Sequence, residues 1–200
     1  MTTPRRLFLV LVASSLCVPA IAAHATPAKK HKPKPACKLV TDGGGDAKGT
    51  GTAVSTPSSD ANLDIISADV ATSATTLTGV VRVSKLASSD SMAPTGWQYQ
   101  VVFTVGGVAD KVDVVVGPGG TSWDGGKGTG KIDAAKKEVR ISVPLSALNV
   151  PVKPGTVLSD IGARTFRVGN SNQIALGLVD TADSTKTYVA GAPSCVKVGA

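Results

Sequence analysis

Side chains branched at Cβ dominate this chain and constrain its fold more than any other feature. Between residues 26 and 200 there are 24 valines, 6 isoleucines and 18 threonines, against 9 leucines, 1 methionine and a single glutamate, Glu138. Branched side chains lose χ1 freedom in helices and pack well on pleated sheets, whereas leucine and glutamate favour helices. The composition therefore predicts an all-β domain.

Two segments alternate apolar and polar residues, as expected for strands with one buried face. In residues 97–105 the predicted buried face holds Trp97, Tyr99, Val101, Phe103 and Val105, and the opposite face holds Gln98, Gln100 and Thr104. In residues 137–143 we expect Val139, Ile141 and Val143 to be buried, with Glu138 and Arg140 facing water.

Further strand candidates are residues 63–70, 77–83, 111–116, 163–168, 174–179 and 187–190. Gly, Pro, Asp and Ser lie between these short segments, which is typical of an antiparallel arrangement. The pattern predicts a two-sheet antiparallel β-sandwich, either Ig-like or jelly-roll-like, with a short helical turn near residues 144–149.

The first 25 residues have the layout of an export signal. Arg5 and Arg6 precede an apolar stretch over residues 7–23, and residues 23–25 (AHA) are typical of a cleavage site. The paired arginines fit both the twin-arginine route and the general route, and the two stay open. Because no segment offers the roughly 20 uninterrupted apolar residues that span a membrane, we expect a secreted, extracellular chain without a transmembrane segment.

Residues 26–36 are rich in proline and carry four lysines, Lys29, Lys30, Lys32 and Lys34. A stretch of this kind has nothing to bury and predicts an extended, solvated tether. Two roles stay open for it: adhesion to anionic wall polymer or lipid headgroups at the cell surface, or a plain linker. Nucleic acid binding is not expected, because the positive charge is concentrated in the tether and no aromatic residue interleaves with the lysines.

Cys37 and Cys195 lie near the two ends of the single domain predicted over residues 37–200. In an oxidising compartment we expect them to form one disulfide bond. Closing so long a loop is worth roughly 5 kcal/mol in the loop-entropy model, although measured bridges contribute about 2–4 kcal/mol. Zinc is not expected, since two cysteines without histidine do not complete a zinc shell.

The domain contains thirteen aspartates against its single glutamate. Aspartate closes turns through its short side chain, and it also ligates calcium. Asp42 and Asp46 flank three glycines and are the best candidates for a calcium site. An ordinary loop is the alternative, because two carboxylates do not supply the six to eight oxygens that calcium takes.

Several short motifs together resemble a module of secreted actinobacterial proteins. They are residues 37–42 (CKLVTD), 45–46 (GD), 63–65 (LDI), 68–70 (ADV), 143–145 (VPL) and 194–196 (SCV). The opening half is similar to the Asp-rich start of family-nine carbohydrate-binding and DOMON-like domains. The resemblance implies a β-sandwich with an ion near Asp42 and Asp46, and it does not imply an activity.

Trp123 is the candidate ligand contact. It lies in residues 117–130, which contain seven glycines. Two interpretations stay open: an exposed contact for a sugar or a partner, or a plug at the mouth of the sandwich. Trp97 and Tyr99 share a face with Phe103, which favours core packing for both.

Catalytic residues are scarce. His24 falls in the signal and His31 in the tether, so the predicted domain lacks histidine, the most common general base. The conceivable glycosidase pairs are Asp110 with Asp113 and Asp180 with Asp183, and turn chemistry explains both more simply.

We therefore expect a noncatalytic, monomeric module that acts by binding or as a structural element at the cell exterior. The alternative is a carbohydrate-binding module for cell-wall or environmental glycan, with a structural calcium ion. A weak Asp-dependent hydrolase is the third hypothesis.

Overall fold

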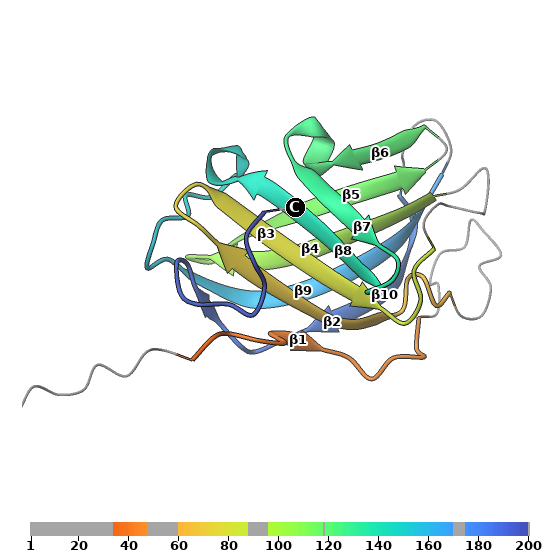
Figure 1. The fold of residues 1–200 in the computed structure, drawn as a ribbon, viewed down its shortest axis with the longest axis horizontal. Coiled ribbons are helices and arrows are strands. Elements are labelled where there is room, and N and C mark those ends of the chain that lie inside the picture. Colours follow the sequence, from red (N-terminus) through yellow and green to blue (C-terminus); the bar gives the residue numbers. More distant parts are fainter. Residues whose placement is uncertain (1–33, 48–59, 88–95, 118, 170–174, 200) are drawn as a thin grey trace, which may run out of the picture. The chain divides into compact units, whose positions relative to one another are not determined.

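The computed structural model describes residues 34–47, 60–87, 96–117, 119–169 and 175–199, and nearly all of its regular structure is β-strand (Figure 1). The strands are β1 (Val40–Thr41), β2 (Ile65–Thr72), β3 (Thr76–Val83), β4 (Gly96–Val105), β5 (Val108–Gly117), β6 (Gly120–Trp123), β7 (Thr129–Asp133), β8 (Glu138–Pro144), β9 (Val157–Val168), β10 (Ala175–Asp183) and β11 (Tyr188–Val189). Two short 3-10 turns, η1 (Asp124–Gly126) and η2 (Leu145–Ala147), lie among them.

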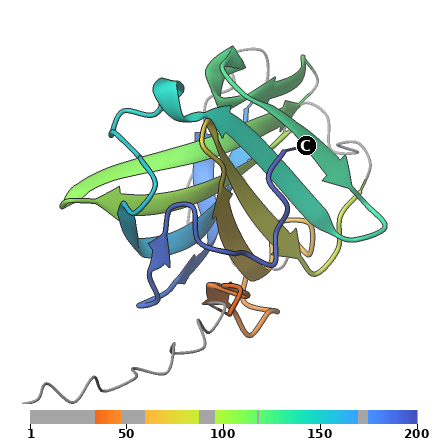
Figure 2. The same cartoon turned by 60° about the vertical axis from the view of Figure 1, so that its left-hand side comes forward.

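The strands form two antiparallel sheets that pack face to face. The front sheet has the order β1-β2-β3-β8-β7, and the back sheet has the order β10-β9-β4-β5-β6, with β11 paired to β9. Figures 1 and 2 show the front sheet lying across the back sheet. Because β6 and β7 belong to different sheets, the chain crosses from one layer to the other through η1.

Apolar side chains from the inner faces of both sheets make the core. Trp97, Tyr99 and Phe103 on β4 are all buried, as the alternation predicts. The sheets approach closely at Gly79 on β3, where a Cβ would lie 2.9 Å from Val112 Cγ2. The absence of a side chain at this position therefore allows the two layers to meet.

The C-terminal segment (residues 194–199) covers part of the outer face of the front sheet. Val196 packs there against Ala71 and Val80, and the Gly199 N–H donates to Thr78 Oγ1 at 3.0 Å. Both faces of β2 and β3 are consequently covered at this point. This explains why most residues of these two strands are buried and do not alternate.

The expectation that Glu138 faces water is wrong. Glu138 lies on the outer face of β8, but it is only 8% exposed. Arg82 Nε on β3 donates to Glu138 Oε2 at 3.0 Å, and Arg140 Nη2 donates to Oε1 at 2.8 Å. Because Arg82 stands directly opposite Glu138 in the β3–β8 register, long cations cover the carboxylate from both sides. Gln98 on β4 is also buried, and its amide donates to Asp113.

Cys37 and Cys195 form the expected disulfide pair, with their Cα atoms 5.1 Å apart. A parallel bridge between Ala36 and Ser194 lies beside them, and the Cys195 N–H donates to the Ala36 carbonyl at 2.9 Å. The predicted signal peptide and tether residues 26–33 lie outside the described residues. Among those described, no helix has the length and apolar character needed to cross a membrane.

The predicted two-sheet antiparallel sandwich is confirmed, and the helical turn near residues 144–149 is the single 3-10 turn η2. Every predicted strand overlaps an observed one, although residue 174 lies outside the described residues. The sequence missed β1, β6 and β7. The last two lie in the glycine-rich region, where strand propensity is low.

Candidate metal centre

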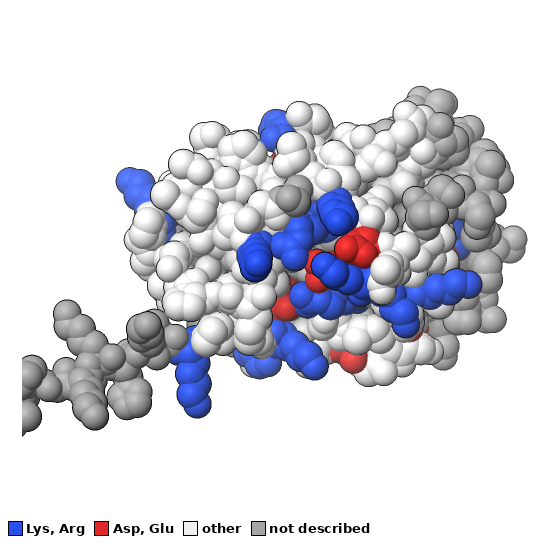
Figure 3. Space-filling view, in the orientation of Figure 1, with Lys and Arg blue, Asp and Glu red and all other residues white. Residues whose placement is uncertain are grey.

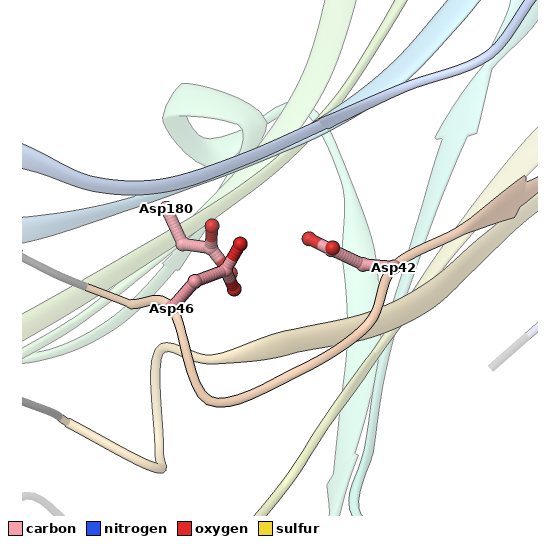
Figure 4. A group of neighbouring side chains, drawn as sticks. All are labelled: Asp42, Asp46 and Asp180. Atoms are coloured by element: carbon pink, nitrogen blue, oxygen red, sulfur yellow. The ribbon is translucent and has the colours of Figure 1, made fainter.

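Three aspartate side chains converge between the edge strands of the two sheets. Asp42 follows β1 of the front sheet, Asp46 lies in the loop after it, and Asp180 lies on β10 of the back sheet. One carboxylate oxygen from each lies within 4.8 Å of the other two. Figure 4 shows the three carboxylates turned toward one another. The fold therefore brings together the two predicted candidates and adds a third.

Asp180 is held firmly in its position. It stands opposite Thr165, which is fully buried, so its side chain points into the sandwich. Its Oδ2 accepts a hydrogen bond from the Ile65 N–H at 2.7 Å, and its Oδ1 accepts one from the Thr181 N–H at 2.7 Å. The Ile65 bond ties β10 to the first residue of β2 in the other sheet.

Asp42 has one satisfied and one unsatisfied carboxylate oxygen. Its Oδ1 accepts a hydrogen bond from the Gly43 N–H at 2.6 Å, whereas its Oδ2 is buried and has no hydrogen-bond partner. Burying a carboxylate oxygen without a donor or a cation costs free energy. This oxygen is the clearest local indication that the cluster accommodates a cation.

The loop that carries Asp46 is shaped by glycine. Gly44 and Gly45 have φ angles of +68° and +83°, which favour glycine over other residues. The Gly45 N–H donates to Asp64 Oδ1 at 2.7 Å, and the Ser84 hydroxyl donates to the other oxygen of Asp64. Asp64 therefore anchors the loop and has donors of its own.

The cluster concentrates negative charge. Burial raises the pKa of Asp42, and the charges of Asp46 and Asp64 raise it further. Burial also raises the pKa of Asp180, with added effects of Asp42 and Asp46. No Lys or Arg in the described ranges pairs with these carboxylates, whereas a cation pairs with each of Asp60, Asp69, Asp113, Asp133, Glu138 and Asp183.

Oxygen ligands from three separate segments suit a hard divalent cation, and calcium accepts such ligands in flexible geometry. Asp42 and Asp46 were predicted from their spacing around the glycines. Asp180 was not predicted as a ligand, because it lies far along the chain and reaches the site only through the packing of β10 beside β1.

Trp123 lies at the end of β6 and is half-buried. It packs against the core, and a Cβ on Gly130 of β7 would overlap its ring and the Arg140 carbonyl. Because β6 and β7 belong to different sheets, the indole fills space between the layers at this edge. This packing favours the interpretation as a plug, and the ligand role of Trp123 stays a prediction.

A polar pocket of about 400 Å³ lies beside β6. Its lining includes Gln98, Asp110, Asp113, Ser122, Asp124 and Lys127. Since β6 pairs only with the second half of β5, the first half of β5 borders this pocket. Burial raises the pKa of Asp124, and the charge of Asp113 raises it further.

The aspartate pairs considered for glycoside hydrolysis have structural partners. Residues three apart in a strand point to opposite faces, which separates Asp180 from Asp183. Asp110 and Asp113 both line the pocket beside β6, but each has partners of its own. Asp110 Oδ2 accepts the N–H groups of Asn149 and Val150 at 2.8 and 3.2 Å. Arg164 pairs with Asp183 at 2.7 Å, and Lys111 pairs with Asp113 at 2.8 Å.

The sequence matches no protein-family model and no curated protein. The class of the protein is thus defined by its fold and its site. It is a two-sheet antiparallel β-sandwich with an acidic cluster between its edge strands.

Proposed function

We propose that this chain is a noncatalytic, calcium-stabilised β-sandwich module that acts by binding at the cell exterior. The observation that carries the proposal is the convergence of Asp42, Asp46 and Asp180 without a neutralising Lys or Arg among the described residues. The buried, unpartnered Oδ2 of Asp42 supports the fit of a cation. An ion bound by these carboxylates would join β1 of one sheet to β10 of the other.

The disulfide pair and the predicted export signal support an extracellular location. Extracellular modules bind calcium with dissociation constants of about 10⁻⁴–10⁻³ M, a range suited to a structural ion supplied by the medium. An ion that neutralises the cluster would remove the repulsion that raises the pKa values of Asp42 and Asp180.

Thermal unfolding of the mature chain (residues 26–200) in chelator, in calcium and in magnesium tests the proposal. We expect calcium at a hundredfold excess over its dissociation constant to add about 2.7 kcal/mol of stability. Magnesium should have a smaller effect, because it demands octahedral geometry and dehydrates reluctantly. Identical melting temperatures in chelator and in calcium would contradict the proposed site.

Glycan binding is the second candidate function, and the polar pocket beside β6 favours it. Carboxylate, amide and hydroxyl groups at its walls are the partners that sugar hydroxyls use. Sedimentation with insoluble wall glycan tests this function. If the pocket binds, Asp124→Asn should weaken binding while Trp123→Phe, which keeps a ring over Gly130, should not. The opposite pattern would move the contact to the indole, and no sedimentation of the wild type would contradict glycan binding.

A further inference from the structure

Lysine and arginine side chains gather on the outer face of the front sheet. Figure 3 shows these cations with carboxylates between them. We define the basic face as Arg82, Lys131, Lys136, Arg140 and Lys197. A pocket of about 290 Å³ lies among them, lined also by Asp133 and Glu138.

The two arginines of the basic face are fixed in place. Arg82 Nη1 pairs with Asp69 at 2.7 Å, and its Nε pairs with Glu138 at 3.0 Å. Arg140 Nη1 donates to the Lys197 carbonyl at 2.6 Å, and its Nη2 pairs with Glu138. These bonds fix Glu138 and Arg140 in the pocket lining, and the Arg140 bond attaches the C-terminal segment to the sheet.

The three lysines are held much less tightly. Lys131 and Lys136 both lie 3.7 Å from Asp133, and their side chains are 63% and 72% exposed. Exposed pairs of this kind contribute little to stability. Lys197 is exposed and has no ion pair within the described ranges. Three ammonium groups can therefore turn toward a ligand without loss to the fold.

The basic face is continuous with the start of the domain. Ala36 pairs with Ser194, three residues before Lys197. The Lys-rich tether predicted over residues 26–36 ends at this bridge. Ala36, the last residue of that predicted tether, therefore lies beside the start of the segment that carries Lys197.

We propose that the basic face binds an anionic polysaccharide, with its pocket taking a carboxylate-bearing sugar unit. The lysines would meet the anionic groups, and Asp133 would accept a hydrogen bond from a hydroxyl between them. Asp133 and Glu138 in the pocket lining disfavour duplex DNA, whose contiguous phosphates are not interleaved with hydroxyl donors. The proposal rests on the proposed function, because it names the partner of a module that acts by binding.

Affinity electrophoresis of the mature chain through gels containing polygalacturonate tests the proposal. The variant Lys131→Ala/Lys136→Ala/Lys197→Ala should weaken retention by about tenfold or more. A matched control removes three exposed lysines that do not line the pocket, Lys85, Lys153 and Lys186. Both variants lose the same charge, so a difference in retention between them reports on the position of the lysines. Because the control lysines lie outside the pocket, we expect the control to change retention less than about twofold.

Neutral dextran in the gel should leave the mobility unchanged, and added salt should release the wild type from polygalacturonate. Equal weakening by the two triple variants would overturn the proposal, since net charge alone would then explain binding. Tighter binding to duplex DNA or to phosphatidylglycerol vesicles would also overturn it. Calcium-dependent melting, measured on the same samples, reports on the proposed function independently of the basic face.

Discussion

Replacing Asp46 with asparagine should affect stability in opposite ways with and without calcium. Asp46 is exposed and accepts no hydrogen bond within the described ranges, so the substitution removes charge and little else. Without an ion, its carboxylate lies within 4.8 Å of those of Asp42 and Asp180 and repels both. With an ion, the same carboxylate is a ligand.

The size of the effect follows from the distance. Two unit charges 4.8 Å apart repel by roughly 0.9 kcal/mol in water and by roughly 3.5 kcal/mol at an effective dielectric constant of about 20. Because Asp46 is exposed, we take the lower value for each of its two pairs and expect Asp46→Asn to stabilise the ion-free protein by about 1–2 kcal/mol. For a domain of this size, that raises the melting temperature by about 2–8 °C.

Calcium should remove or reverse this advantage, because it stabilises the wild type by about 2.7 kcal/mol at a hundredfold excess and the variant by less. Differential scanning calorimetry in chelator and in calcium measures both differences. Asp160→Asn is the matched control, since Asp160 is also exposed and lies outside the cluster. If Asp46→Asn behaved like the control in both buffers, the argument for a shared ion would be refuted.

Three further measurements follow from the structure. Replacing Cys37 and Cys195 with serine should cost about 2–4 kcal/mol in urea unfolding, and an unchanged midpoint would show that the bridge does not form. Asp60→Asn should cost about 3–5 kcal/mol, because it leaves the buried guanidinium of Arg167 without its charged partner, and a loss below about 1 kcal/mol would contradict that burial. In the ion-free protein the pKa values of Asp42 and Asp180 are raised, so the folded state binds more protons than the unfolded state. These two groups therefore destabilise the folded state at high pH, and that destabilisation is lost as the pH falls through their folded-state pKa values. The stabilisation by calcium should accordingly fade over the same range, and a calcium effect on melting temperature that stays constant into mild acid would contradict it.

The sequence predicted the parts of the fold that depend on local alternation. On β4 the predicted inward residues are buried except Val105, which is partly buried, and on β8 Val139, Ile141 and Val143 are buried as expected. The covering of the front sheet's outer face was not predictable in this way. Val196 lies over Ala71 and Val80 only because the C-terminal segment returns across the sheet, and no local pattern records that contact.

The same distinction applies to the candidate site. Asp42 and Asp46 were found because they flank a glycine run, which is a local signal. Asp180 lies on β10 just after an irregularity in the pairing with β9, and both Val179 and Asp180 are buried. Two adjacent buried residues break the alternation that would have marked Asp180 as an inward-pointing carboxylate.

Isothermal titration of calcium into the chelator-treated mature chain tests most directly whether Asp42, Asp46 and Asp180 hold an ion. We predict one calcium ion per chain and a large loss of affinity in Asp46→Asn, with no loss in Asp160→Asn. Absence of calcium binding by a folded wild type, or equal affinity in wild type and Asp46→Asn, would contradict the calcium-stabilised sandwich.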